Sequence, residues 1–233
     1  MAIGSFFLKK GFSLGRAYEA KPVGGAVLPV LLAALLVIGV ATGAYAVSAE
    51  GPGSKHASII LSLVVALIIG ALAQKSRMCF AGSIRDLILM KNFDLISIIA
   101  ALFAVMAVYN VVNGSFHLGF SGQPIAHSQH LWNILGMYVV GFAAVLAGGC
   151  PLRQLILAGQ GSSDSAVTFL GMLIGAAFAH NFGLVGAAAK AATETEPAVA
   201  GGPAAAGKIA VIVCIIVLFV IAGTNLRRKK TAK

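Results

Sequence analysis

Apolar residues along the chain gather into six runs of about spanning length, separated by short polar segments. A helix needs about 20 mostly apolar residues to cross the hydrocarbon core of a bilayer. The pattern therefore predicts an all-α integral membrane protein with about six transmembrane helices. The six runs are Val23–Val47, Ala57–Ala73, Leu95–Val112, Leu131–Ala147, Ala166–Ala189 and Ile209–Thr224.

Two further apolar segments, Ile84–Met90 and Leu152–Ala158, are too short to span a bilayer. Both lie between longer runs, where broken helices are expected. Irregular backbone at membrane depth is tolerated only where protein or a water-filled cavity satisfies its polar groups. We therefore predict a short re-entrant half-helix at each segment.

The composition agrees with a membrane location. Hydrophobic residues make up 59% of the 233 positions and charged residues only 10%, whereas soluble domains have about 45–50% and about 25%. The formal net charge is +10, but the basic residues lie between the apolar runs, which favours a role in topology over nucleic-acid binding. The first 16 residues lack the features of a cleaved signal peptide.

Basic residues fall mostly on one predicted side of the membrane. Fourteen of the 17 lie in segments 1–22, 74–94, 148–165 and the C-terminal tail, and three lie in the alternate loops. The positive-inside rule then places both termini in the cytoplasm and loop 113–130 outside, in a multi-pass protein of the inner (plasma) membrane. The predicted organisation is a cytoplasmic segment 1–22, a transmembrane transport domain 23–226 and a basic tail 227–233.

Two stretches of the sequence resemble each other. An Arg-x-Leu-Ile-Leu motif begins at Arg85 and again at Arg153, and each follows a cysteine, Cys79 or Cys150. The cysteines are 71 residues apart, as are Asn110 and Asn181. We predict repeat units at about 57–112 and 131–189, because duplicated units with discontinuous helices are common in secondary transporters. Similar composition alone is the alternative, and the repeats could be parallel or inverted.

The second motif reads Gly-Gly-Cys-Pro-Leu-Arg, with Pro151 suited to the first position of a helix. Cys150 would then be the N-cap residue, near free backbone N–H groups that attract anions. Gly149 permits close approach of a ligand, and Arg153 projects near the same end. This set suits a polarisable oxyanion. A structural helix start with Arg153 extended toward the interface is the alternative.

The first motif places Cys79 before Gly82 and a Ser-x-x-Asp sequence that starts at Ser83. That sequence has the form of a capping box, with Asp86 in the usual Glu position. We include Cys79, Gly82, Ser83 and Arg85 as candidate substrate-binding residues. Arg85 could bind an anion or simply pair with Asp86.

Other polar or reactive residues were weighed in the same way. Cys214 lies in a continuous aliphatic run and is predicted to be structural. Three cysteines form no disulfide framework or zinc motif, and His117, His127 and His130 lack the partners of a metal site, so no metal or cofactor is predicted. The candidate pore-lining residues, which could instead make interhelical hydrogen bonds, are Asn110, His180 and Asn181.

The stretches QKSRMCFAGSIRDLILMKNF, GGCPLRQLILAGQGSSDSA and FLGMLIGAAFAHNFGL resemble the YeeE/YedE family of sulfur-transport membrane proteins. Within it they are most similar to the YedE branch, described as selenium transporters. The resemblance covers roughly Pro22 to Gly186. It implies a helical bundle with membrane-dipping loops that takes up thiosulfate or a related sulfur or selenium anion, passed between thiols. Cys79 and Cys150 match the motif cysteines of the family.

Longer family members have an additional N-terminal half, and this chain is similar to the C-terminal half only. The resemblance therefore implies a second copy or an N-terminal-half partner chain, and a TusA-like sulfur carrier at the cytoplasmic face. The leading hypothesis is a transporter rather than an enzyme, with membrane lipid around it. A thiol or persulfide-relay enzyme and a non-transporting subunit of a larger uptake complex are the alternatives.

Overall fold

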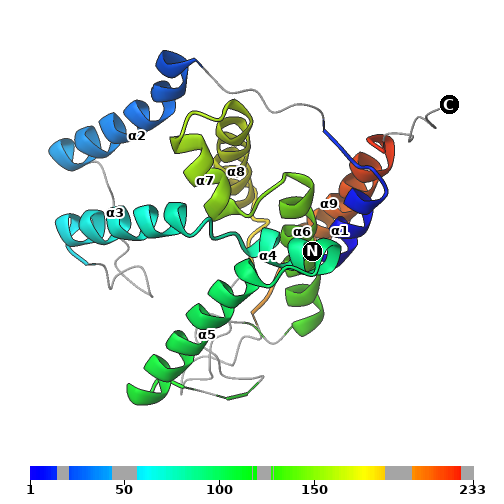
Figure 1. The fold of residues 1–233 in the computed structure, drawn as a ribbon. Helices are drawn as coiled ribbons and strands as arrows, with labels where there is room; N and C mark the ends of the chain where they lie inside the picture. Colours follow the sequence, from blue (N-terminus) through cyan, green and yellow to red (C-terminus); the bar gives the residue numbers. More distant parts are fainter. Residues whose placement is uncertain are drawn as a thin grey trace. The chain divides into compact units, whose positions relative to one another are not determined.

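The computed structural model describes residues 1–14, 21–43, 57–116, 118–119, 127, 129–186 and 201–226. Within these ranges every regular element is a helix, and an isolated antiparallel bridge joins Phe12 to Leu226. The helices are α1 (Ala2–Lys9), α2 (Pro22–Thr42), α3 (Ile59–Lys75), α4 (Phe80–Met90), α5 (Asp94–Val112), α6 (His130–Leu146), α7 (Pro151–Gly159), α8 (Ser163–Asn181) and α9 (Ala205–Thr224) (Figure 1). The predicted all-α class is confirmed.

Five stretches of the described chain are long and apolar enough to cross a membrane. They are Val23–Thr42, Ile59–Met90, Asp94–Val112, His130–Gly159 and Ala205–Thr224. The sixth predicted run forms α8, which falls outside this set because Asp164 at one end and His180 and Asn181 at the other lower its mean hydropathy. The chain is thus an all-α, multi-pass membrane protein.

The same order of helix lengths occurs twice along the chain. A long helix, a short helix and a second long helix occur as α3, α4 and α5, of 17, 11 and 19 residues, and again as α6, α7 and α8, of 17, 9 and 19 residues (Figure 1). The short helices α4 and α7 contain the two short apolar segments of the sequence. Their order agrees with the proposed repeat units, which stay a prediction.

The long helices α3 and α6 end in the same backbone motif. After α3, Arg77 has a positive φ of 54°, and the Met78 N–H donates to the Ala73 carbonyl at 3.1 Å. After α6, Gly148 has a φ of 80°, and the Gly149 N–H donates to the Ala144 carbonyl at 3.0 Å. This is the Schellman arrangement, which satisfies carbonyls at a helix end. Each motif is followed immediately by a cysteine, Cys79 or Cys150.

The chain divides into two compact units, which are described separately. The first unit comprises Met1–Gly15, Cys79–Cys150 and Gly171–Lys233, and the second comprises Arg16–Met78 and Pro151–Leu170. Helix α8 contributes residues to both units.

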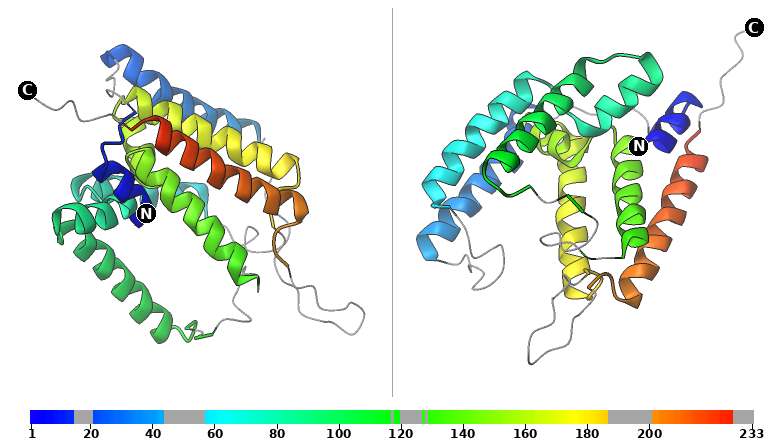
Figure 2. Two further views of the ribbon diagram at one scale, coloured as in Figure 1. Left: turned by 90° about the vertical axis from the view of Figure 1, so that its right-hand side faces the viewer. Right: turned by 90° about the horizontal axis from the view of Figure 1, so that it is seen from below.

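The core of the first unit lies where α1, α6 and α9 meet (Figure 2). Its buried residues are Phe12, Phe142, Leu146 and Ala222. The Phe142 ring centroid lies 5.8 Å from that of Phe7 and 5.1 Å from that of Phe219. Burial of such aromatic groups stabilises this junction. Helix α1 was not among the elements predicted, because eight residues make no apolar run of spanning length.

The second unit contains α2, α3, α7 and the beginning of α8, with α2 in contact with α7. Helix α2 begins with Pro22, whose fixed φ suits the first helical turn, and α3 begins after Ser58, whose side chain accepts a hydrogen bond from the Leu61 N–H at 3.4 Å. Gly161, with a φ of 93°, follows α7. A Cβ added there would lie 3.2 Å from the Gly25 Cα, so only glycine allows this approach of α2.

Candidate functional site: a pair of buried thiols and two motif arginines

The two motif cysteines stand directly before the two short helices. Cys79 is the N-cap residue of α4, and its Sγ accepts a hydrogen bond from the Gly82 N–H at 3.2 Å. Cys150 precedes Pro151, the first residue of α7. An N-cap side chain normally satisfies one of the backbone N–H groups that a helix start leaves without a partner. In α4 a sulfur atom has this role instead of the usual oxygen.

Within the first unit the two cysteines meet, although they are 71 residues apart. The Cys150 N–H donates to the Cys79 Sγ at 3.4 Å. Cys79 is 7% exposed and Cys150 is 3% exposed, and neither is in a disulfide. The structure therefore joins the two predicted cysteines into one buried dithiol.

The capping box predicted at Ser83 is wrong. Helix α4 begins at Phe80, four residues earlier than the prediction required, because Cys79 and not Ser83 is its N-cap residue. Ser83 consequently lies inside the helix, where its hydroxyl donates to the Phe80 carbonyl at 2.9 Å. Serine side chains in helices commonly form this local bond with the preceding turn. Ser83 is 1% exposed, and its role as a ligand stays a prediction.

Two candidate glycines have clear backbone roles. A Cβ at Gly82 would lie 3.2 Å from both the Cβ and the Sγ of Cys79, so the absence of a side chain lets the sulfur reach the helix start. The Gly149 N–H is already donated to Ala144, as described above, which removes it from the set of free anion donors. Gly149 therefore serves the turn that leads into Cys150.

The two motif arginines have different partners. The Arg85 Nε donates to the Asp86 carboxylate at 2.7 Å, so the two side chains form an ion pair. In the second unit, Arg153 Nη1 donates to the Gln74 amide oxygen at 2.9 Å. Of the two possibilities left open for Arg85, the structure contains the pairing with Asp86. The charge of Arg153 has a neutral hydrogen-bond partner instead.

The predicted pore-lining residues belong to the ends of α5 and α8. His180 and Asn181 are exposed in the first unit, Asn110 is half-buried, and the Asn181 amide donates to the Ala177 carbonyl of its own helix at 2.8 Å. Their role in a path stays a prediction. Cys214 is exposed on α9, as a lipid-facing residue would be. Among the loop histidines, His117 lies outside the described residues.

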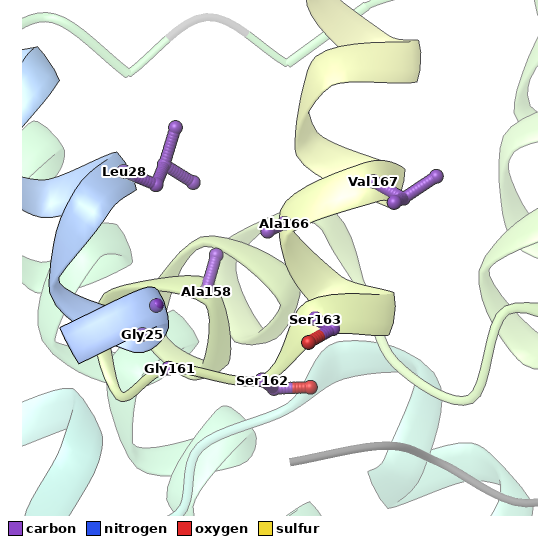
Figure 3. A pocket seen from close by; sticks show the side chains of 9 residues that line it. Gly25, Leu28, Ala158, Gly161, Ser162, Ser163, Ala166 and Val167 are labelled. Atoms are coloured by element: carbon purple, nitrogen blue, oxygen red, sulfur yellow. The ribbon is translucent and has the colours of Figure 1, made fainter. Parts of the chain in front are cut away.

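A separate pocket of about 250 Å³ lies in the second unit between α2, α7 and α8 (Figure 3). Its wall is formed by glycines and small or apolar side chains, including Leu28, Ala158 and Val167, with the hydroxyl groups of Ser162 and Ser163 at one side. It contains no charged side chain and no cysteine. Its lining offers no charge to bind a divalent anion, so the candidate residues are the cysteine pair and Arg85 in the first unit and Arg153 in the second.

Gln74 is the residue that the sequence analysis missed. It lies at the end of an apolar helix, next to basic residues that we interpreted as topological. A signal was present in the offset of 71 residues, which aligns Ala73 with Ala144 and Cys79 with Cys150 but Gln74 with the apolar Val145. Lys75 likewise aligns with the apolar Leu146, so the ends of the two helices differ in polarity at consecutive positions.

Comparison with known proteins agrees with the motifs. The family described as Sulphur transport matches residues 75–233, more than half of the chain. The thiosulfate transporter TsuA of Escherichia coli is 29% identical over 119 residues, and that of Spirochaeta thermophila is 27% identical over 113 residues. These regions cover 50% and 47% of this chain, but only 33% of each relative's own length. No solved structure matches. The family match, together with the cysteine and arginine motifs, shows that the chain belongs to the sulphur-transport family, YeeE/YedE.

Proposed function

We propose that this chain transports a small sulfur-containing anion of the thiosulfate type across the membrane. The observation that carries the proposal is the meeting of Cys79 and Cys150 at the starts of two short helices. Membership of the sulphur-transport family and the similarity to proteins named thiosulfate transporters support the same substrate class. Selenium anions share the charge and softness of these substrates and belong to the same proposal.

The chemistry of the residues suits such an anion. A thiol is both a weak donor and a polarisable acceptor, which matches the terminal sulfur of thiosulfate. A guanidinium offers a planar fork of N–H donors that matches the oxygens at the other end. The sequence places Arg153 three residues after Cys150, within the first turn of α7. We propose that the dithiol receives the sulfur end and that Arg153 receives the oxygens.

Uptake of radiolabelled thiosulfate into proteoliposomes tests the proposal. Unlabelled thiosulfate, sulfite, selenite and sulfate are added in separate competition assays. We expect anions with a soft sulfur or selenium centre to compete better than sulfate, in which oxygens cover the central atom. No uptake above that of empty liposomes, or equal competition by all four anions, would contradict the proposal.

A redox or persulfide-carrying thiol enzyme is the second candidate, and the observation that favours it is the hydrogen bond from the Cys150 N–H to the Cys79 Sγ, which brings the two buried cysteines together. Mass-tagging of free thiols during turnover separates the two. A transporter that binds its substrate through hydrogen bonds keeps both thiols free, whereas an enzyme of this kind accumulates a disulfide or a persulfide.

We further propose that a second chain, either another copy or an N-terminal-half partner, completes the path. Many large apolar side chains of the described spans are exposed in the single chain. Helix α5 has no buried residue at all. Chemical cross-linking in native membranes, followed by mass spectrometry, tests for the second chain and for a TusA-like carrier.

The orientation proposed from the basic residues places both termini in the cytoplasm of an inner-membrane protein. A Ser121→Cys variant tests it, since loop 113–130 is predicted to be outside. Labelling of the new thiol by a membrane-impermeant reagent added to the outside of intact cells is expected. Labelling only from the cytoplasmic side would reverse the assignment.

A further inference from the structure

We infer that Gln74 is a positioning residue that fixes the Arg153 guanidinium while leaving its positive charge available to the anion. The inference rests on the proposed function, because it assumes that Arg153 meets the substrate. It concerns a residue that lies just outside the region matched by the family, which begins at residue 75.

The first support is the contact itself. Gln74 lies one residue before the end of α3, and its Oε1 accepts a hydrogen bond from Arg153 Nη1 at 2.9 Å, within the second unit. Both side chains are half-buried. A guanidinium has five N–H donors, and one bond to a neutral amide leaves the other four for further acceptors. The bond thus restricts the orientation of the guanidinium and uses only one of its N–H groups.

The second support is electrostatic. Among the described residues of the second unit, Asp164 is the sole carboxylate, and Arg153 takes part in no ion pair. Lys75 and Arg77 follow Gln74 directly in the sequence. An amide oxygen therefore orients Arg153 in a region rich in positive charge. A carboxylate in its place would hold the guanidinium equally well but would cancel the charge that an anion needs.

The third support comes from the other motif, where such a carboxylate exists. Arg85 is bonded to Asp86 at 2.7 Å, and the residue that corresponds to Asp86 in the second motif is Gln154. The acidic residue of the first motif is thus replaced by an amide in the second, and the acceptor that holds Arg153 is also an amide. With an amide at both positions, neither Gln74 nor Gln154 gives Arg153 a negatively charged partner.

Two substitutions at one position separate charge from geometry. Gln74→Glu keeps the acceptor and the size of the side chain but adds a negative charge beside Arg153. Gln74→Met keeps the approximate size but removes the acceptor without adding charge. Gln160→Glu is the matched control, because it adds the same charge at an exposed position of the same unit, whereas the side-chain partner of Arg153 is Gln74.

The test measures KM and maximal rate for thiosulfate uptake into proteoliposomes, with insertion and monodispersity checked for each variant. We expect Gln74→Glu to raise KM by about tenfold or more, since one charge-assisted hydrogen bond is worth that order in affinity. Gln74→Met is expected to raise KM less, by a few-fold, and Gln160→Glu to change KM by less than about twofold, because exposed charges are screened.

A purely structural role predicts the opposite order. If Gln74 only anchors two helices, Glu retains the anchor as an ion pair, so Gln74→Glu behaves like wild type and Gln74→Met is the damaged variant. That order would overturn the inference and leave the proposed function intact. A wild-type chain that shows no thiosulfate uptake would overturn the proposed function and the inference with it.

Discussion

Helices α4 and α7 begin in the same way, but their arginines lie at different positions in the helix and have different partners. Each follows a Schellman turn, and each has a cysteine directly before its first residue. Arg85 is the sixth residue of α4, whereas Arg153 is the third residue of α7. Three residues displace a side chain by about 4.5 Å along a helix. Arg153 therefore lies in the first turn of its helix, and Arg85 lies almost a turn further on, bonded to Asp86.

The comparison indicates which features the two predicted repeat units share and which they do not. The Schellman turn that ends the long helix is a hydrogen-bonded feature of the backbone, and it occurs after both α3 and α6, each time followed directly by a cysteine. The position and the partner of the arginine differ between the two units. We interpret the first copy as having an arginine held in an ion pair and the second as having an arginine kept for an anion.

The largest effect is expected at the thiols that the two copies share. Replacing Cys79 or Cys150 by alanine should reduce thiosulfate uptake to background, because each thiol is one half of the buried dithiol. Cys214→Ala is the control, and it should retain wild-type uptake because Cys214 is exposed on α9. Uptake per inserted protein is the measurement. Loss of uptake in Cys214→Ala with activity retained in Cys150→Ala would reverse the assignment.

The arginines give the next largest effect and the most direct test of the asymmetry. Arg153→Ala should lower uptake by about tenfold or more, the worth of a lost charge-assisted hydrogen bond, and Arg153→Lys should be almost as damaging because lysine lacks the planar fork. Arg85→Ala should cost only a few-fold. Initial rates and sulfate competition are compared for the three variants, and equal losses at Arg85 and Arg153 would remove the proposed difference.

A smaller effect is expected at Gly82, which shapes the first copy alone. In Gly82→Ala the new Cβ would meet the Cys79 sulfur at 3.2 Å, tighter than ordinary contact, and should displace it from the helix start. We expect a several-fold rise in KM for uptake with normal membrane insertion. Gly70→Ala in α3 has no neighbouring heavy atom within 4 Å and is the matched control. Identical KM values for both variants would show that the sulfur position is not critical.

The smallest effect is expected at Ser83. Its hydroxyl hydrogen is already donated to the Phe80 carbonyl, which leaves only a weak acceptor to offer a substrate. Ser83→Ala should therefore change the KM for thiosulfate by less than about twofold, since the local bond contributes little net free energy. A tenfold rise in KM would restore Ser83 as a direct ligand.

The sequence predicted those features of the fold that depend on local hydrophobicity and on rare residues. Continuous apolar runs of spanning length predicted the long helices, and two shorter apolar segments between them predicted the two short ones. The start of α4 was misplaced, because Ser83 has the usual chemistry of a cap and Cys79 does not. Sulfur is a weak acceptor, so no propensity rule selects it over a nearby serine.

The partners of the candidate residues could not be predicted, because they depend on packing between distant segments. The contact between Cys79 and Cys150 joins residues 71 apart, and that between Gln74 and Arg153 joins residues 79 apart. The Arg85–Asp86 pair was foreseen as one of two possibilities because its members are neighbours in the sequence. Adjacency in the chain is visible in a sequence, whereas tertiary adjacency requires the folded backbone.

The shortness of α4 and α7 has a consequence for how membrane voltage acts on the substrate. At 1.5 Å per residue they are about 16 Å and 14 Å long, roughly half the hydrocarbon thickness. Where such a helix ends inside a bilayer and a water-filled cavity satisfies its backbone, the electric potential falls across a thinner insulating layer. Moving a divalent anion across a full membrane potential of 100 mV changes its electrostatic free energy by about 4.6 kcal/mol. We expect much of this free-energy change to occur within the thinner insulating layer, where we place the two thiols.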